Sequence, residues 1–185
     1  MSSVIISGDT SGAVTIAAPA VAGTNTLTLQ AGTATNSMNT LATAVASTSG
    51  TSIDFTSIPS WVKRITVMLN GVSTSSTSNY LLQIGSGSID TATYISACAY
   101  TTNTVTSTNG FTIANGIGAS DLCSGVIVLA YLGSNVWAQS GVVSSNVVRS
   151  SSGSKTLSGT LDRIRITSVT PDTFDAGSVN ILYEG

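Results

Sequence analysis

The stretch VIVLAYL, residues 126–132, is the longest apolar run of the chain and lies between Gly125 and Gly133. Seven apolar residues are too few to span a membrane as a helix, and the flanking glycines indicate turns or bends. A strand that is apolar at every position is typical of a central strand covered on both faces. We therefore expect residues 126–132 to form a strand in the middle of the core.

Alternating apolar and polar residues predict further strands around this run. The clearest case is residues 64–69, where Ile65, Val67 and Leu69 point to one face and Asn70-Gly71 then supplies a turn that allows a positive φ. The same alternation occurs in residues 80–84, 163–167 and 179–183. We expect the last two to form a closing hairpin, connected by residues 172–177.

Turn-forming residues separate these strands. Asn109-Gly110 and Asn115-Gly116 mark turns, and residues 73–79, which are six hydroxyl residues and an Asn, indicate an exposed loop. Short strands every 10 to 15 residues, without helical crossovers, predict an all-β domain. We expect residues 51–185 to form one antiparallel, jelly-roll-like β-sandwich.

Residues 1–50 differ from the rest, because they contain no aromatic residue and only one charged side chain, Asp9. Short alternating runs at 13–16 and 26–29 predict strands that bury too little apolar area to form a core of their own. We expect an extended N-terminal arm that attaches to another protein or intertwines with other copies. In residues 36–50, apolar residues at spacings of three and four allow a helical turn, and the composition fits a linker equally well.

The composition argues against an enzyme. The chain has no His, one Glu, 8% charged residues and a net charge of −2, whereas Ser and Thr together number 59. A Ser-His-Asp triad is therefore excluded, and six basic residues in 185 are too few for a nucleic-acid partner. The glycines of 85–88 and 116–119 are expected in loops, not in a nucleophile elbow or a nucleotide site. We expect no catalytic residues and no cofactor.

Four acids near the C-terminus are the remaining catalytic or metal-binding candidates: Asp162, Asp172, Asp175 and Glu184. A carboxylate pair can cleave glycosides, and oxygen-rich loops around Asp172 and Asp175 can bind calcium. Acids at turns more commonly accept turn hydrogen bonds or pair with nearby cations, here Arg163 and Arg165. We favour this structural role and expect no metal site.

The only two cysteines, Cys98 and Cys123, lack CxxC spacing and any His to complete a zinc site. We expect two buried free thiols. A disulfide is the alternative, and it would form only if the protein were oxidised after its release from the cell.

The aromatic side chains leave two interpretations open. Rings such as Trp61, Tyr80, Tyr94, Tyr100, Tyr131 and Trp137 can stack on sugars if they are exposed, amid hydroxyl and amide groups that hydrogen-bond to a glycan. The alternative, which we favour, is that Trp61 and Trp137 pack in the core or between subunits.

The N-terminus has no basic segment followed by an apolar one, so we expect no signal peptide, and no run is long enough for a membrane span. These features predict synthesis in the cytoplasm.

Several segments resemble tail-fibre-like and other virion proteins of tailed bacteriophages. They are residues 4–16 and 19–29 of the opening, residues 53–59 and 61–65, and residues 173–181. The resemblance covers about a quarter of the chain and implies a phage structural protein made in the bacterial host, often trimeric, with an N-terminal attachment segment and a β-rich globular end.

The chain departs from long fibres because it has no second copy of its opening motif and no sustained heptad. We therefore expect a virion structural protein, either a short fibre or a capsid decoration component. It would form a homotrimer through the sandwich and bind other capsid or tail proteins through the arm. The alternative is a receptor-binding tip or adhesin that recognises host cell-surface glycan.

Overall fold

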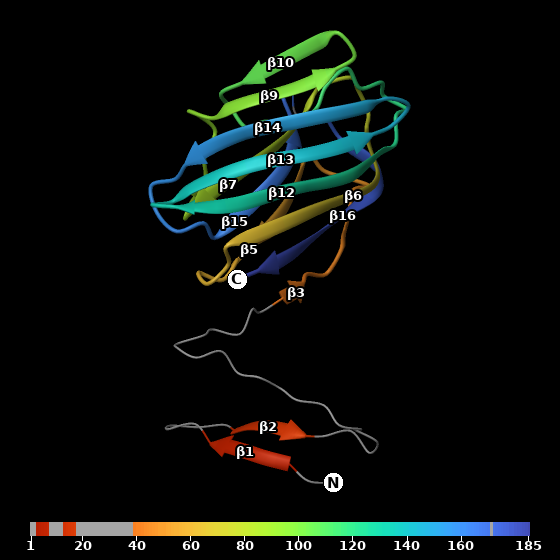
Figure 1. Ribbon diagram of the computed structural model, residues 1–185. Helices are drawn as coiled ribbons and strands as arrows, with labels where there is room; N and C mark the ends of the chain where they lie inside the picture. The colour runs from red at the N-terminus through yellow and green to blue at the C-terminus, as the bar shows by residue number, and fades with distance from the viewer. Residues whose placement is uncertain (1–2, 8–12, 18–38, 171) are drawn as a thin grey trace. The chain divides into compact units, whose positions relative to one another are not determined.

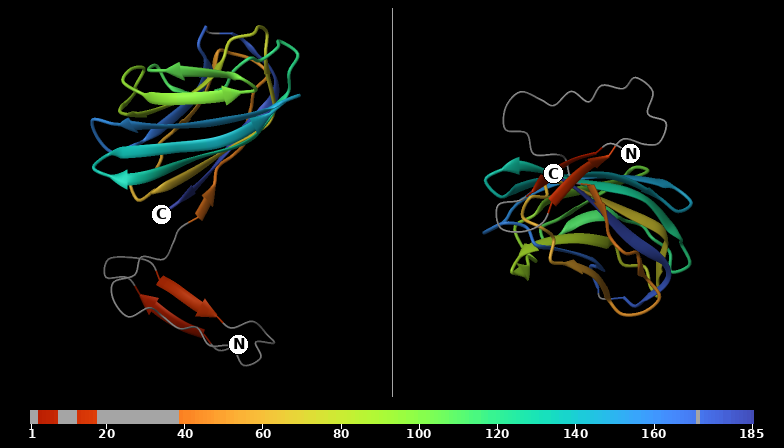
Figure 2. Two further views of the ribbon diagram at one scale, coloured as in Figure 1. Left: turned by 45° about the horizontal axis from the view of Figure 1, so that its top comes forward. Right: turned by 90° about the horizontal axis from the view of Figure 1, so that it is seen from below.

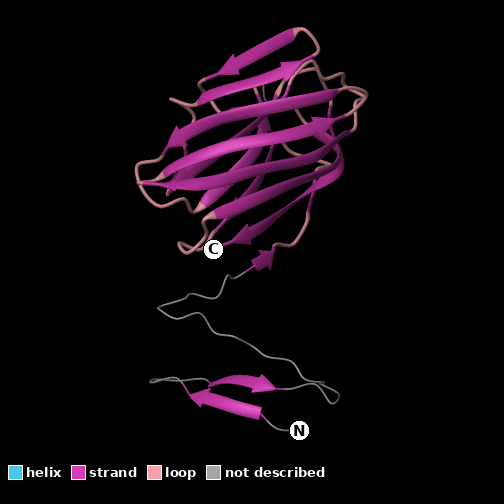
Figure 3. Ribbon diagram, viewed as in Figure 1, coloured by secondary structure: helices cyan, strands magenta, loops and turns pink. Residues whose placement is uncertain are grey.

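The computed structural model describes residues 3–7, 13–17, 39–170 and 172–185. All the regular elements in these ranges are β-strands, as Figure 3 shows, and the strand pairs in both sheets of the larger unit are antiparallel. The all-β, antiparallel prediction is therefore confirmed. The chain forms two compact units, residues 1–36 and residues 37–185.

The first unit contains a β-hairpin. β1 (Ser3–Ser7) pairs antiparallel with β2 (Ala13–Ala17), with Ser3 opposite Ala17 and Ser7 opposite Ala13. β2 coincides with the strand predicted at 13–16. The strand predicted at 26–29 lies outside the described residues.

The second unit is a sandwich of two sheets. The large sheet has nine strands in the order β10-β9-β14-β13-β12-β6-β16-β3, and the short β4 also pairs with β16 (Figure 1). Its strands are β3 (Asn39–Leu41), β4 (Val45–Ala46), β6 (Arg64–Thr74), β9 (Ile95–Tyr100), β10 (Asn103–Ser107), β12 (Cys123–Gly133), β13 (Val136–Ser144), β14 (Val148–Thr156) and β16 (Phe174–Glu184).

The small sheet has five strands in the order β11-β7-β15-β5, and β8 also pairs with β7. Its strands are β5 (Ser52–Thr56), β7 (Tyr80–Ser86), β8 (Ser88–Ile89), β11 (Phe111–Ala114) and β15 (Arg163–Ser168). This sheet forms a second layer, which lies behind the large sheet in the view of Figure 1 and is seen from two other directions in Figure 2.

The core lies between the two sheets and is built mainly from alternate residues of their strands. Ile65, Val67, Ile127 and Leu129 of the large sheet are 0% exposed, as are Leu82, Ile84, Ile164 and Ile166 of the small sheet. Every second residue of a strand points to the same face, so each strand contributes one apolar row.

The prediction that residues 126–132 are covered on both faces is wrong. β12 does lie near the middle of the large sheet, but only alternate residues such as Ile127 and Leu129 are buried. Val126 is 46% exposed and Leu132 is 66% exposed, because the small sheet packs against the opposite face of this sheet.

The predicted closing hairpin is also wrong. β15 belongs to the small sheet and β16 to the large sheet, so the connection between them crosses from one layer to the other. Each strand still buries one apolar face, and alternation alone does not distinguish a hairpin from two strands in facing sheets.

Asn70-Gly71 does not end a strand, because β6 continues to Thr74. Gly71 has a φ of +63°, as the pattern predicts, but it lies at an irregularity in the pairing between β6 and its neighbours. Opposite it, a Cβ on Gly177 would lie 2.3 Å from the Gly71 carbonyl oxygen. The Asn-Gly pair therefore bends the strand instead of ending it. The loop that was predicted to begin at residue 73 begins at residue 75, after the end of β6.

The region around residues 36–50 contains short strands instead of a helical turn. β3 and β4 pair with β16, and the Ala42 N–H donates to the Ile181 carbonyl at 2.9 Å. Residues 39–46 thus extend the large sheet, and the sandwich begins before the boundary expected at residue 51.

Candidate functional site

The outer face of the large sheet is the most distinctive surface of the sandwich. Eight large apolar side chains are exposed among the described residues, and six of them lie on strands of this sheet. These six are Leu41, Ile95, Val126, Leu132, Val142 and Val148. Isolated exposed apolar residues are common on proteins, but a concentration on one flat face marks an interaction surface.

Three apolar side chains from three adjacent strands meet at the centre of this face. In the register, Val126 of β12 lies opposite Met68 of β6 and opposite Val142 of β13. Val126 and Val142 are 46% and 50% exposed, and Met68 is half-buried. Directly opposed residues in a sheet lie close enough for their side chains to touch, so these three form one apolar cluster.

Small hydroxyl and methyl side chains continue the face beyond this cluster. Val142 lies opposite Ser150 of β14, which in turn lies opposite Ala99 of β9. The next row contains Ser140, Ser152 and Ala97. Side chains this small leave the sheet surface flat, and a flat surface can be covered closely by another one.

The outer faces of the two sheets differ in charge. Among the described residues on the outer face of the large sheet, the charged ones lie near the ends of the strands. They are the exposed Asp175, next to the buried Phe174 in β16, and Arg64 and Glu184, which form an ion pair of 3.4 Å. The small sheet instead carries Arg165, whose Nε donates to Asp54 at 2.7 Å, and Arg163 beside it. Charged side chains keep a surface hydrated, so the small sheet resembles an ordinary solvent-facing surface and the large sheet does not.

The size of the outer face suits a protein–protein contact. Seven adjacent strands from β16 to β10 at about 4.8 Å spacing, and about 20 Å along the strands, give roughly 600 Å² of flat surface. A standard interface buries about 800 Å² on each partner, so this face supplies most of one interface.

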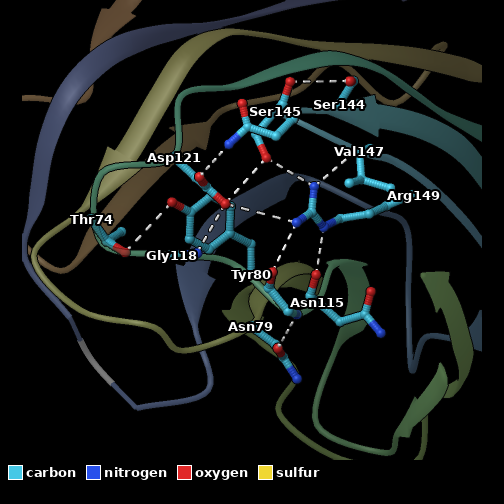
Figure 4. A network of polar contacts seen from close by, with 12 residues as sticks. Thr74, Asn79, Tyr80, Asn115, Gly118, Asp121, Ser144, Ser145, Val147 and Arg149 are labelled. Carbon is cyan, nitrogen blue, oxygen red and sulfur yellow. Dashed lines mark hydrogen bonds and ion pairs between the residues drawn. The ribbon is translucent and has the colours of Figure 1, made fainter. Parts of the chain in front are cut away.

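A buried arginine organises one end of the sandwich (Figure 4). Arg149 of β14 is 1% exposed, and its guanidinium donates to the carbonyls of Asn115, Gly116 and Val147 and to the Ser145 hydroxyl. All these acceptors lie in the loops before β12 and β14. The guanidinium also lies 4.7 Å from the centre of the Tyr100 ring.

Asp121 completes this network. One of its carboxylate oxygens lies 3.9 Å from Arg149, and the carboxylate accepts hydrogen bonds from the Gly118 N–H, the Ser145 hydroxyl and the Asn146 amide. Because each of the three guanidinium nitrogens donates at least one hydrogen bond within the chain, we interpret the cluster as a brace for the two loops.

The four candidate acids do not form one site. Asp162 accepts two hydrogen bonds from Arg163, which lower the pKa of this carboxyl below its usual value, and also accepts one from the Gly87 N–H. Asp172 accepts from the Ser78 N–H, Asp175 is exposed, and Glu184 pairs with Arg64. Asp162 thus has the predicted partner, Arg163. Asp172 instead accepts from a loop that is distant in the chain, and Glu184 pairs with Arg64 and not with Arg163 or Arg165. No group of three or more potential metal ligands occurs in the described ranges.

Both cysteines are buried free thiols, as expected. Burial raises the pKa of both thiols to about 11, so they stay protonated at neutral pH. The Cys98 Sγ lies 3.5 Å from the Asn115 side-chain oxygen, within the region that Arg149 braces.

None of the ten aromatic residues of the chain is exposed, and all of them lie in the described part of the sandwich. Trp137 is 3% exposed and packs against Tyr131 with ring centroids 5.3 Å apart, and Trp61 is half-buried. Tyr94 is buried against Phe111 at 4.9 Å. This arrangement favours the packing interpretation over rings that stack on sugars.

The glycine-rich segments have structural positions. Gly85 to Ser88 form the tight turn between β7 and β8, and the Gly116 carbonyl accepts from Arg149.

The described residues include no helix that is long and apolar enough to cross a membrane. No protein-family model, curated protein or solved structure matches the chain.

The sequence pattern does not identify the outer face, because a run that is apolar at every position, such as residues 126–132, predicts a strand with both faces buried in the core. A usable signal was present in the neighbouring strands. Residues 136–144 and 148–156 contain Ser, Ala and Val at alternate positions but no charged residue at the positions that face outward.

Proposed function

We propose that this protein is a non-enzymatic structural component of a bacteriophage virion, a short fibre or a capsid decoration component. Its copies associate through the sandwich as a homotrimer, and the arm within residues 1–50 attaches to other virion proteins of the capsid or tail. The observation that best supports self-association is the outer face of the large sheet, which is apolar, flat and almost free of charge.

The physical argument is that exposed apolar area is costly in water. Fully burying a valine side chain contributes about 1.5 to 3 kcal/mol, so covering the half-exposed Val126 and Val142 contributes about 1 kcal/mol each. Three copies whose outer faces surround a common axis would each cover this surface with the other two. Such a closed arrangement satisfies the symmetry expected of a homo-oligomer.

The virion role rests on the resemblance of the opening segments and of residues 53–65 and 173–181 to phage virion proteins. A covered, charge-poor interface fits a protein that must persist on a particle outside the cell. The proposal places the protein on the released virion after synthesis in the bacterial cytoplasm.

The self-association is tested by introducing charge at the centre of the outer face. The double variant Val126→Lys and Val142→Lys places two lysines side by side at positions that a trimer would bury, and isolated buried charges are strongly unfavourable. We expect wild-type protein to have three times the mass of the 18.6 kDa chain in light scattering, and the variant to have the mass of one chain.

The matched control is Thr51→Lys with Thr56→Lys, which adds the same charge at two exposed positions of the small sheet's edge, Thr51 just before β5 and Thr56 at its end. This control should keep the wild-type mass. Equal masses for the two double variants would refute the outer face as the contact surface.

The arm is tested separately by deleting residues 1–35. We expect purified particles to lack the truncated chain, while the sandwich keeps the far-ultraviolet circular dichroism and unfolding transition of the full chain. Full occupancy of the truncated chain on particles would contradict attachment through the arm and leave the outer-face result unaffected.

A further inference from the structure

The edges of the two sheets differ in how well they are protected. An edge strand presents N–H and C=O groups that have no partner in the ladder, and proteins protect such strands by shortness, charge, proline, bulges or a covering element. The sandwich has four edges. They are formed by β10 and by β3 with β4 in the large sheet, and by β11 and β5 in the small sheet.

Three of these edges carry a recognisable protection. β3 and β4 contain only three and two residues. β5 presents the exposed Asp54, held by Arg165 at 2.7 Å. All four residues of β11 are buried, and the Thr112 N–H donates to the Ser96 hydroxyl at 2.8 Å.

Within the described residues, β10 has none of these protections. Its sequence, NTVTS at 103–107, contains neither a charged residue nor a proline. It pairs with β9 in unbroken register from Asn103 opposite Tyr100 to Ser107 opposite Ser96, so it has no bulge. Two surface hollows of about 490 and 300 Å³ are each lined in part by residues 106–108, which leaves the end of the strand unpacked on that side.

The sequence of β10 is nearly symmetric about its centre. If two copies of the strand paired antiparallel about Val105, Val105 would lie opposite Val105 of the second copy, and Thr104 opposite its Thr106. Thr–Thr and β-branched pairs are favourable across strands, and no like charges would meet. A two-fold interface requires such self-complementarity, because each residue meets its symmetry partner.

We propose that β10 is a second contact surface of this protein, and that it pairs edge to edge with β10 of another copy. The pairing would join the two large sheets into one continuous sheet, with main-chain hydrogen bonds between the strands. Five residues make a small contact, so the association is weak and depends on protein concentration. This contact goes beyond the proposed trimer, because it links one assembly to the next through a different surface.

Two double variants at the exposed positions 104 and 106 test the pairing. Thr104→Lys with Thr106→Lys places lysine opposite lysine twice in the paired strands. Thr104→Lys with Thr106→Glu places lysine opposite glutamate twice, because residue 104 of one copy faces residue 106 of the other. Within a single chain both variants put two charged residues at the same two sites, which face outward on the large sheet. The mass and the circular dichroism of each variant at low concentration therefore show first whether folding and the trimer are unchanged.

The measurement is mass as a function of concentration by analytical ultracentrifugation. We expect wild-type protein and the lysine–glutamate variant to associate further as concentration rises. The lysine–lysine variant should need at least about tenfold higher concentration, which corresponds to about 1.4 kcal/mol. Identical concentration dependence for the two variants would overturn the proposal. If the outer-face trimer does not form, the mass at low concentration is that of one chain instead of three. The difference between the two variants at high concentration still tests the pairing of β10, so failure of the trimer and failure of the edge pairing are distinguishable.

Hydrogen exchange on the wild-type chain gives a second readout that needs no variant. Pairing predicts that amides within residues 103–107 exchange more slowly at high than at low protein concentration, while those of β5 do not change. Exchange in β10 that is independent of concentration would also overturn the proposal.

Discussion

The two faces of the large sheet are built from the same strands but have different surroundings. On the inner face Val67, Ile127 and Leu129 are fully buried against the small sheet. On the outer face Val126 and Val142 are about half exposed, although they are as apolar as their neighbours. An apolar residue in a strand therefore identifies a surface that is favourable to cover, but it does not say whether the same chain covers it.

The inner face itself changes character across the sheet. It is aliphatic under β6 and β12, whereas β13 and β14 contribute buried polar side chains, among them Gln139, Arg149 and Lys155. The Lys155 ammonium pairs with Asp90 at 3.0 Å and donates to the Ala92 carbonyl. Arg149 and Lys155 are tolerated in the interior because their charged groups have hydrogen-bond partners, and they hold the neighbouring loops in place. Gln139 is only partly satisfied, since its amide nitrogen donates to the Ser151 hydroxyl at 2.8 Å but its side-chain oxygen has no partner among the described residues.

The largest expected effect separates the two faces within one strand. Leu129→Ala removes a fully buried side chain and leaves a cavity, so it should lower the free energy of unfolding by about 3 kcal/mol. Val126→Ala, on the outer face, should lower it by no more than about 0.5 kcal/mol in the dissociated chain, since exposed positions contribute little. Urea unfolding at low protein concentration measures both.

The same pair of variants also tests coverage of the outer face. At concentrations where copies associate, the destabilisation by Val126→Ala should grow, and that by Leu129→Ala should not. Equal effects of the two variants in the dissociated chain would contradict the assignment of inner and outer faces.

A smaller effect concerns the thiols on the inner face. The pKa of Cys98 and Cys123 is raised to about 11 in the folded chain, against about 8.5 for an unfolded thiol. The folded state therefore keeps its protons where the unfolded state loses them. This contribution to stability is present below about pH 8.5 and is lost as pH rises towards 11. We expect the free energy of unfolding to fall by about 2 kcal/mol from pH 8 to pH 9.5.

The control is the double variant Cys98→Ala and Cys123→Ala, which removes both thiols and should show a flatter dependence over the same pH range. The range ends below the ordinary pKa of tyrosine, so the buried tyrosines contribute little to the difference. A wild-type slope that matches the variant would show that the thiols do not titrate with the fold.

The sequence predicted local strand content well and long-range connections poorly. The alternation at 64–69, 80–84 and 163–167 placed three strands correctly, because the period of a half-buried strand is a local property. The hairpin expected between residues 163–167 and residues 179–183 is absent from the sandwich. The two strands join different sheets, because the sheet that a strand joins depends on partners distant in the chain. The spacing in residues 36–50 suggested a helical turn, but that region adds β3 and β4 to β16.

The candidate site divides in the same way. The composition excluded catalysis by histidine, because the chain contains none. The burial of both thiols and the pairing of Asp162 with Arg163 agree with the predictions, whereas the partners of Asp172 and Glu184 were not predicted. The outer face was not found, because an apolar run does not reveal whether one or two layers cover it. Nor did the strand pattern reveal the exposed edge of β10, since an edge is defined only when every other strand has been placed.

The sequence by itself determined that this protein is all-β, poor in charge and built around alternating apolar rows, since these properties follow from side-chain chemistry and the two-residue period of a strand. Only the tertiary structure decided which row faces the second sheet, which row faces out and which strand lies at an open edge. The physical reason is that burial and edge exposure depend on strand order, which contacts between residues distant in the chain establish.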